Sequence, residues 1–371
     1  MSDEIVVVGN RGRDPNQLFL TLGAAEYSGW EDISVTLRAE GFPNSFEISV
    51  SIAATGSLPA QEGEECFVHL GDDRVVTGYV DRVIEGGDAS IHRVTILGRG
   101  RTQDLVDCGA EWPSHQLIGG NALTIAQNLA KPYGVAVALG NGATPGPDVA
   151  QWPLNYGETA AEIVQRLARN AGLLAYEDSD GQLLLAKVGT EAAASGIVWG
   201  QNVEEWSVER SMDQRFSEYV CCSESMDAMM ELGGSDFFDV ESDPNVPRHR
   251  RMYLVVEFVA TDPQAFTIQR AKWEAARRAG RSFICRATVD SWRDKSGALW
   301  APNTLIPVSL PGSAGHDDLI IASVTFRREN GRGTTAEIVA MPKSAFTPEP
   351  ITLVPVNLAD IAPVPQAGPN Q

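Results

Sequence analysis

Apolar and polar side chains alternate in short runs over residues 18–108, which is the pattern of half-buried β-strands. Turn-forming residues interrupt these runs at 41–44, 71–73 and 85–88. The strands that the pattern predicts are 18–22, 33–37, 46–52, 66–70, 75–83 and 92–97. Many short strands at this spacing favour a small antiparallel barrel or sandwich.

Helical spacing of apolar residues begins after this region. A short stripe over 123–129 and a longer one over 160–171 predict two helices, and Gly172 is placed to cap the second. Two short apolar runs then flank an Asp-Ser-Asp-Gly turn at 178–181, which predicts a hairpin. This alternation of helix and strand favours a compact α/β domain.

Strand patterning returns over 206–223, 252–259 and 283–289. The last of these runs leads into a segment that contains two tryptophans. A final hairpin is predicted around Asn330 and Gly331, because Asn-Gly between two alternating runs is a strong turn signal. The carboxyl-terminal half of the chain is therefore expected to hold a second strand-rich region.

One predicted helix in this half is basic and follows an acidic segment. Asp262 as N-cap and Pro263 at the first helical position predict a helix to about Ala279, with Gly280 behind it. The segment 223–243 holds seven acidic residues and no Lys or Arg, whereas the helix and its exit carry Arg270, Lys272, Arg277, Arg278 and Arg281 against Glu274 alone. We expect the two to meet across a subunit boundary, and two separately solvated faces are the alternative.

The cysteines and histidines do not form a recognisable site. The five cysteines are odd in number, far apart and without a Cys-x-x-Cys pair, so neither zinc nor a disulfide framework is expected. Cys221 and Cys222 are neighbours in a predicted strand, so one is expected to be buried and the other exposed or at an interface. The remaining cysteines are Cys66, Cys108 and Cys285, and the scattered histidines are His69, His92, His115, His249 and His316.

The chain also lacks the common catalytic and nucleotide-binding motifs, including GxSxG, HExxH, Walker A and the dinucleotide fingerprint. Gly98-Arg99-Gly100 is a lone Gly-x-Gly and is predicted to be a turn at a barrel edge rather than a phosphate loop. A glycosidase-like pair stays open, because 49 acidic residues bring some carboxylates together by chance. We predict no catalytic, cofactor-binding or metal-binding residues, no cofactor and no enzymatic activity.

The formal net charge of −20 limits the kinds of partner. A protein that grips DNA or an anionic membrane is usually basic, and this chain would repel both. No apolar run approaches the roughly 18 residues of a membrane span. Acidic residues near the start stand where a signal peptide carries positive charge. The sequence predicts a protein made in a cytosol-like compartment that does not bind membranes by itself.

The segment 290–311, DSWRDKSGALWAPNTLIPVSLP, places two tryptophans and a Pro-Asn corner between two predicted strands. Together with VTILGRGRTQDLVDC at 94–108 and RFSEY at 215–219, it resembles the central baseplate hub of Mu-like contractile-tailed phages, the tail protein P family. Trp30 and Trp300 stand at comparable strand-entry points, and both are expected in cores. A carbohydrate-stacking platform is the alternative.

This resemblance implies a mainly β fold with α/β insertions. Two related antiparallel β-barrel tube domains and two smaller α/β domains are expected in each subunit of a trimeric ring. The implied ranges are 1–110 for the first barrel, 111–200 for one α/β domain, 201–240 with 300–350 for the second barrel, and 241–299 for an α/β insertion. A Pro-rich tail at 351–371 is expected to run extended or to be disordered.

The same resemblance implies a passive structural function. The protein is expected to be the homotrimeric hub that adapts a six-fold tail tube to a three-fold spike, enclosing a passage for DNA without sequence-specific binding. Its implied partners are the spike, the tube or distal tube and the tape-measure protein, in a baseplate assembled in host cytoplasm and carried in the virion. The alternatives are a hub-associated peptidoglycan hydrolase and the hub of a tail-like bacteriocin or type VI secretion spike base.

Overall fold

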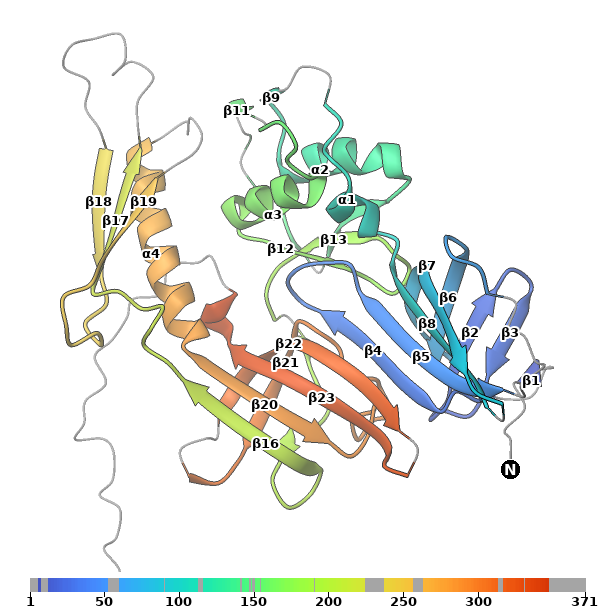
Figure 1. Ribbon diagram of the computed structural model, residues 1–371. Helices are drawn as coiled ribbons and strands as arrows, with labels where there is room; N and C mark the ends of the chain where they lie inside the picture. The colour runs from blue at the N-terminus through green and yellow to red at the C-terminus, as the bar shows by residue number, and fades with distance from the viewer. Residues whose placement is uncertain are drawn as a thin grey trace, which may run out of the picture.

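The computed structural model describes residues 6–7, 13–52, 60–89, 91–112, 116–140, 142–146, 148, 151–153, 155–189, 191–223, 237–255, 263–312, 316–329 and 331–346. Their largest element is one curled sheet, and two α/β units lie beside the same end of its central strands (Figure 1). The expectation of a mainly β protein is confirmed. The Pro-rich tail, Asp262 and most of the acidic segment lie outside the described residues.

The large sheet contains 15 strands within the described part of the chain. Twelve of them follow the order β1-β3-β2-β6-β7-β8-β5-β4-β22-β23-β20-β16. Its amino-terminal half consists of β1 (Val6–Val7), β2 (Leu18–Leu22), β3 (Ala25–Ser28), β4 (Asp32–Arg38), β5 (Ser45–Ile52), β6 (Glu65–Leu70), β7 (Asp73–Gly87) and β8 (His92–Gly100). All six strands that the alternating pattern predicted are present in this half.

The carboxyl-terminal half of the sheet is assembled from two separate stretches of chain, 191–210 and 283–342. It consists of β14 (Glu191–Ala192), β15 (Ile197–Val198), β16 (Val203–Arg210), β20 (Phe283–Val289), β21 (Thr304–Ser309), β22 (His316–Glu329) and β23 (Gly333–Pro342). β14 and β15 pair in parallel with β21, and β21 pairs with β22. β22 and β23 form the predicted hairpin.

The two halves join along a seam between β4 and β22, with Arg38 opposite Ser323 at one end and Ile33 opposite Arg328 at the other. β4 pairs with β5 on its other edge, so its backbone is hydrogen-bonded on both sides. The sequence predicted two barrel domains, but the structure has one continuous sheet with one shared apolar core. Strand patterning did not reveal this continuity, because it does not record pairing between segments so far apart in sequence.

The strand pairings also regroup segments that the predicted domain ranges separated. β20 lies within 241–299, the predicted α/β insertion, yet it pairs with β16 and β23 in the large sheet. β17 (Glu218–Ser223) and β18 (Phe237–Ser242) lie mostly in 201–240, the predicted second barrel, yet they form a separate sheet with β19 (Arg251–Val255). The period-2 pattern predicts a strand but not the sheet that it joins.

The first α/β unit follows β8 directly. Its helices are α1 (Gln103–Asp107), α2 (Ala122–Ala130), the short η1 (Lys131–Tyr133) and α3 (Ala160–Ala171), and its strands are β9 (Gln116–Ile118), β10 (Val137–Gly140), β11 (Gln151–Pro153), β12 (Leu174–Glu177) and β13 (Leu183–Ala186). Thr159 and Glu162 form a capping box at the start of α3, and Gly172 ends it with a left-handed φ of 78°. The predicted helices and the β12–β13 hairpin are confirmed.

The second α/β unit packs the sheet β18-β17-β19 on α4 (Pro263–Arg281). Residues Tyr219 and Cys221 of β17 face Ala271 and Ala275 of the helix. The predicted stop at Gly280 was wrong, because the helix continues through Arg281. Gly280 instead allows the short η4 (Lys343–Ala345) to approach, since a Cβ there would lie 2.2 Å from the Ala345 nitrogen.

Candidate functional site

The tryptophan segment that carried the resemblance is part of the sheet core. Trp292 and Trp300 are almost fully buried, and their indole nitrogens donate to the carbonyl oxygens of Arg327 at 2.8 Å and Ser291 at 3.1 Å. The ring of Trp292 meets Phe326 edge-on at 6.3 Å between centroids. The expectation that Trp300 and Trp30 belong to the core is confirmed, since both are 3% exposed or less.

The Pro-Asn corner of the same segment connects two regions of the chain. Asn303 has a left-handed φ of 62°, which is uncommon outside glycine and best tolerated by asparagine. Its side chain accepts from the Gly189 nitrogen at 2.7 Å and donates to the Lys187 carbonyl at 2.8 Å. Asn303 therefore fixes the exit of the first α/β unit against the carboxyl-terminal half of the sheet.

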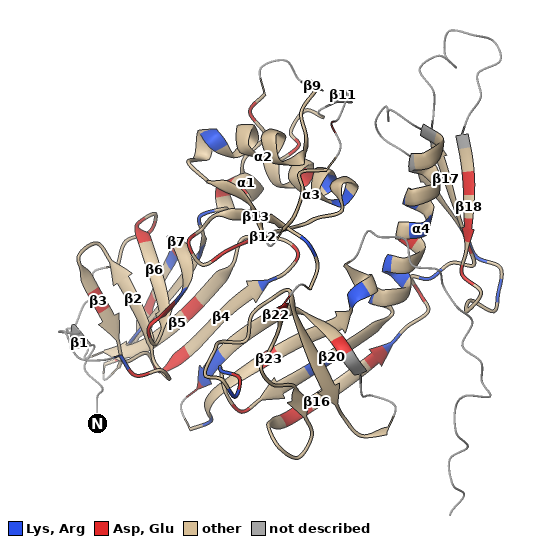
Figure 2. Ribbon diagram, turned by 180° about the vertical axis from the view of Figure 1, so that it is seen from behind, with Lys and Arg blue, Asp and Glu red and all other residues tan. Residues whose placement is uncertain are grey.

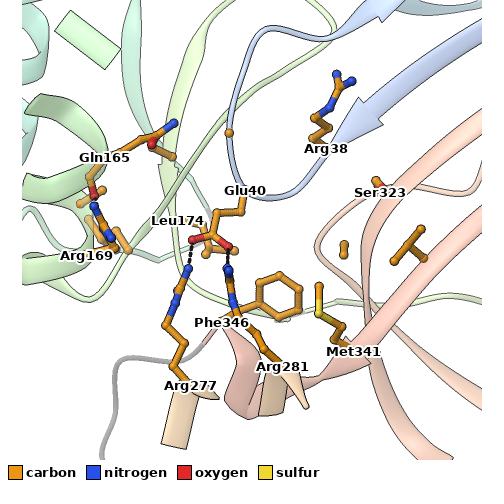
Figure 3. A pocket seen from close by; sticks show the side chains of 16 residues that line it. Arg38, Glu40, Gln165, Arg169, Leu174, Arg277, Arg281, Ser323, Met341 and Phe346 are labelled. Carbon is orange, nitrogen blue, oxygen red and sulfur yellow. Dashed lines mark hydrogen bonds and ion pairs between the residues drawn. The ribbon is translucent and has the colours of Figure 1, made fainter. Parts of the chain in front are cut away.

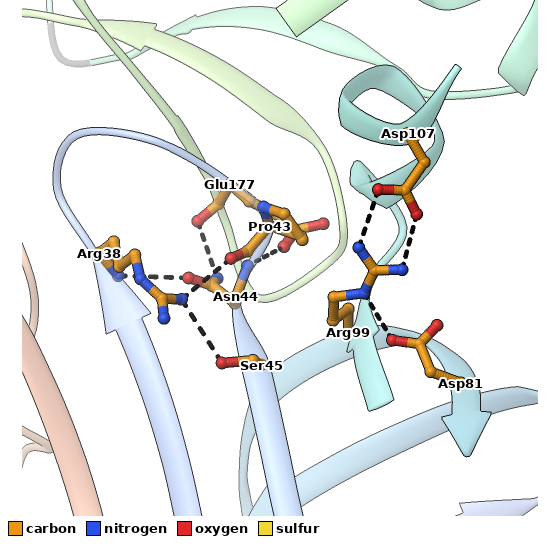
Figure 4. A network of polar contacts seen from close by, with 8 residues as sticks. All are labelled: Arg38, Pro43, Asn44, Ser45, Asp81, Arg99, Asp107 and Glu177. Carbon is orange, nitrogen blue, oxygen red and sulfur yellow. Dashed lines mark hydrogen bonds and ion pairs between the residues drawn. The ribbon is translucent and has the colours of Figure 1, made fainter. Parts of the chain in front are cut away.

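A buried carboxylate holds the first α/β unit against the amino-terminal half of the sheet (Figure 4). Glu177, at the end of β12, accepts from the backbone nitrogens of Asn44 at 2.8 Å and Thr102 at 2.9 Å. The Asn44 amide donates in return to the Glu177 carbonyl at 3.1 Å. Burial raises the pKa of Glu177 to about 7, although the two backbone donors oppose the shift.

One glycine of β8 makes room for this junction, and a second makes room for the core of the large sheet. A Cβ at Gly100 would lie 1.8 Å from a Glu177 carboxylate oxygen, and one at Gly98 would lie 2.4 Å from the Phe46 ring. Between them, Arg99 donates to Asp81 at 2.5 Å and to both oxygens of Asp107 (Figure 4). The predicted turn at 98–100 is instead the end of a strand, and its glycines serve close packing.

A second junction brings α4 against the seam of the large sheet. Glu40, which follows β4, forms ion pairs with Arg277 and Arg281 on successive turns of α4 (Figure 3). Nothing in the local sequence singles out Glu40, because its partners lie 237 and 241 residues further along the chain. Glu177 is equally hidden, and its one signal is an acidic residue at the end of an apolar strand.

The basic helix satisfies much of its charge within its own chain. Glu274 pairs with Arg270 at 2.7 Å and with Arg278 at 2.6 Å, in addition to the two pairs of Glu40. The described end of the acidic segment lies on the same helix, since β18 packs on α4 and Glu241 interacts with Lys272. Figure 2 shows the basic segments of α4 beside the acidic ones of β18. The expected meeting of acidic segment and helix therefore occurs, for these residues, inside one subunit.

The outer face of the sheet β18-β17-β19 is apolar. Phe238, Val240, Tyr253 and Val255 point away from α4 and are 51% to 63% exposed. They flank Val220 and Cys222 in register on the central strand. Exposed apolar rows on this scale mark surfaces that contact another protein.

The cysteines and histidines lie apart from one another. Cys221 is buried against α4 and the partly exposed Cys222 faces the opposite side, as the alternation predicted, and its thiol donates to the Leu254 carbonyl at 3.2 Å. Burial, together with Arg13 and Arg74, lowers the pKa of His69 to about 4. His115 lies outside the described residues. No group of three or more potential metal ligands occurs in the part of the chain that the structure describes.

No helix among the described residues combines the length and apolar character that crossing a membrane requires. The described surface is instead shaped by the two junctions and by the apolar row on β18 and β19. These features position separate units relative to one another and leave surfaces for contact with other molecules.

Three family models match consecutive parts of the chain. They are the Mu phage baseplate assembly protein GpP-like amino-terminal domain at residues 17–100, the second domain of baseplate hub protein gp44-like proteins at 102–187, and the fourth domain of GpP at 263–349. The chain is also 27% identical over 362 residues to the baseplate hub protein gp44 of Escherichia phage Mu, covering 92% of this chain and 90% of gp44.

Solved structures are similar over most of the chain. The 43 kDa tail protein of prophage MuSo2 from Shewanella oneidensis is 29% identical, with a TM-score of 0.78 and coverage of 89% of this chain and 99% of that one. A component of the Escherichia coli type VI secretion system, described as similar to the T4 tail proteins gp27 and gp5, has a TM-score of 0.56 at 12% identity. The match covers 88% of this chain and 77% of that one, and at this identity it shows a shared fold alone.

The curled sheet with its two α/β units therefore defines a phage tail protein of the hub class. The chain belongs to the Mu phage baseplate hub family, that of gp44 and GpP, whose members are structural proteins of the tail baseplate. The family resemblance drawn from the tryptophan segment and its two companion blocks is confirmed.

Proposed function

We propose that this chain is the trimeric symmetry adaptor of a contractile tail baseplate, joining a six-fold tail tube to a three-fold spike and enclosing the passage for DNA. The observation that carries the proposal is the seam between β4 and β22. It places two strand-rich halves of one chain side by side in one curled sheet. Three chains then supply six such halves around an axis, which matches a three-fold partner on one side and a six-fold partner on the other.

The surface of the described chain supports an assembled state. The strands at the two ends of the large sheet, β1 and β16, each have one unpaired edge within the described residues. Exposed edges template pairing with other chains unless a neighbour covers them. The apolar row on β18 and β19 is a further surface that contact would shield from water. The proposed neighbours are two further copies of this chain, the spike, and the tube or tape-measure proteins, in the baseplate of the virion after assembly in host cytoplasm.

Size-exclusion chromatography with light scattering tests the proposal directly. We expect three copies of this chain in the complex with its spike. The protein alone should form a trimer at sufficient concentration. A stable dimer in the complex with the spike would contradict the adaptor, since two chains supply four halves rather than six.

The competing function is peptidoglycan hydrolysis by the first α/β unit. Glu177 of this unit is a buried acid with a raised pKa, which is the one property that it shares with a general acid. However, both of its oxygens accept backbone hydrogen bonds, and the side chain is buried at a domain junction. We expect purified protein to leave peptidoglycan intact, and turnover that one Asp or Glu substitution abolishes would favour the enzyme.

A tail-like bacteriocin or a type VI spike base would use the same adaptor geometry. The similarity to the type VI component concerns the fold alone, so it does not favour that alternative over a phage. A reconstruction of particles purified from producing cells distinguishes them. Particles with DNA-filled heads support the phage hub, whereas headless tails or a membrane-anchored spike would support one of the alternatives.

A further inference from the structure

A cavity of ≈ 520 Å³ lies where β4, α3, α4 and the β22–β23 hairpin meet (Figure 3). We call it the arginine pocket. Its polar lining consists chiefly of Arg38, Glu40, Arg169, Arg277 and Arg281. Apolar side chains, including Leu174, Met341 and Phe346, line the rest. The volume is in the range of cavities that bind small molecules.

The arginine pocket carries an excess of positive charge. Four guanidinium groups line it against the single carboxylate of Glu40, which leaves three positive charges among the lining residues. This excess occurs in a chain whose formal net charge is −20. Glu40 is already shared between Arg277 and Arg281, so it does not neutralise the remaining two arginines.

Arg169 shows the consequence of this imbalance. Its Nε donates to the Gln165 carbonyl of its own helix at 3.2 Å, and it forms no ion pair with a described carboxylate. Burial and the neighbouring Arg277 and Arg270 lower the pKa of Arg169. Burial and Arg277 also lower the pKa of Arg281. These guanidinium groups therefore repel one another, and a bound anion would relieve the repulsion.

Arg38, which also lines the pocket, likewise forms no ion pair with a described carboxylate. Its Nη1 donates to the Pro43 carbonyl at 3.0 Å, and burial lowers its pKa. An anion in the pocket would thus face guanidinium groups from α3 and α4. Guanidinium groups present paired donors that match the oxygens of phosphate.

We propose that the arginine pocket binds a small multivalent oxyanion of the phosphate class, held between Arg169 and the pair Arg277 and Arg281. The anion would tie α3 and α4 together beside the end of the seam. The pocket volume excludes a DNA duplex, so the ligand is either a free inorganic anion or the phosphate end of a nucleotide. These two sources share one recognition chemistry.

Isothermal titration calorimetry on the full chain tests the proposal, with phosphate, pyrophosphate and ATP compared at constant ionic strength in chloride. We expect one site per chain, with pyrophosphate bound more tightly than phosphate. ATP binding at the strength of pyrophosphate indicates a free anion as the natural ligand. Binding of ATP at least about tenfold tighter than pyrophosphate indicates a nucleotide.

Three variants link the binding to the pocket. Arg169→Gln is expected to weaken pyrophosphate binding at least about tenfold, the usual scale of a lost charge-assisted hydrogen bond. Glu40→Gln is expected to tighten it, because the competing carboxylate is removed. Arg332→Gln removes one positive charge, as Arg169→Gln does. Arg332 lies in the distant turn between β22 and β23, where it pairs with Glu204 and Glu205, so this variant should leave binding unchanged.

Circular dichroism and thermal unfolding establish that each variant is folded before binding is compared. If Glu40→Gln does not fold, Arg169→Gln alone decides. The proposal is overturned if none of the three anions binds saturably, or if Arg169→Gln binds pyrophosphate as the parent does. Binding of an acidic peptide such as tetraglutamate without any binding of phosphate or pyrophosphate would also overturn it.

Discussion

Glu177 and Asn303 are single buried polar side chains that each join two units of the chain. Each satisfies backbone groups of a distant segment, so each junction has partners that only this side chain supplies. Leaving such a group unpaired after burial costs about 1 to 3 kcal/mol. The relative placement of the first α/β unit therefore depends on a few polar atoms in addition to apolar packing.

The raised pKa of Glu177 predicts a particular dependence of stability on pH. The folded protein holds the proton up to about pH 7, whereas the unfolded chain releases it near the ordinary value of 4.5. The contribution is therefore fully present below pH 4.5 and is lost as the pH rises toward 7. We expect Glu177 to lower the free energy of unfolding by at most roughly 3 kcal/mol over that interval.

Urea denaturation of the parent and of Glu177→Gln at pH 5 and pH 7.5 measures this effect. Glutamine cannot titrate and places an amide group against one of the two backbone donors, so the variant should be less stable at pH 5. The difference between the two proteins should shrink at pH 7.5. The lowered pKa of His69 makes the folded protein less stable as the pH falls, and this effect is the same in the parent and in the variant. An equal difference at the two pH values would contradict the assignment.

The residues that sequence reasoning identified correctly are those whose role is local. Trp30 and Trp300 were placed in cores because large aromatic side chains at strand entries bury most of their surface, and both are buried. Glu40 and Glu177 were not identified, because their role depends on partners 75 to 241 residues away. No local pattern records such a contact.

The same distinction holds for helices and strands. α3 was predicted correctly with its Gly172 end, because its apolar stripe and cap are written in adjacent residues. Gly280 was misread as the end of α4, since a glycine required for close approach looks the same in sequence as a glycine that ends a helix. β20 was recognised as a strand but assigned to the wrong unit. Pairing between segments far apart in the chain decides that assignment.

An engineered disulfide tests the seam between β4 and β22. Thr36 and Thr325 lie directly opposite each other, with 3.0 Å between their hydroxyl oxygens. Opposed residues of an antiparallel pair have the Cα separation that a disulfide requires. We expect the double variant Thr36→Cys, Thr325→Cys to form an intramolecular bond on oxidation.

Thiol counting and mass spectrometry of tryptic peptides measure the outcome. The oxidised double variant should keep the five free thiols of the parent and yield one linked peptide pair that reductant separates. The single variant Thr36→Cys is the control and should yield six free thiols, one more than the parent. A double variant that stays fully reduced under the same conditions would place the two strands apart.

At the scale of the whole molecule, charge distribution bears on the proposed passage. Duplex DNA carries one negative charge per roughly 1.7 Å of its axis, and each Lys or Arg that pairs with phosphate gains free energy by counterion release. A basic lining would hold the genome at every step, whereas an acidic lining leaves it free to slide. Screening over about 8 Å means that only side chains near the inner wall matter.

We therefore expect the inner wall of the trimer to carry mainly acidic and neutral side chains. A reconstruction of the assembled tail tip at side-chain resolution provides the measurement, as a comparison of acidic and basic residues facing the passage. The arginine pocket does not count against the expectation, because its guanidinium groups line the junction between α3, α4 and the large sheet. A wall on which Lys and Arg outnumber Asp and Glu would contradict it.

The seam also determines how long β4 lacks a partner strand while the chain is being synthesised. Thr36 and Thr325 are separated by 289 residues, so at about 5 to 20 residues per second β22 leaves the ribosome roughly 15 to 60 s after β4. Throughout that interval one edge of β4 has no partner and is open to strands of other nascent chains. Ser34, Thr36 and Arg38 give that edge alternating polar positions, which lower its tendency to aggregate while the ribosome finishes the second half.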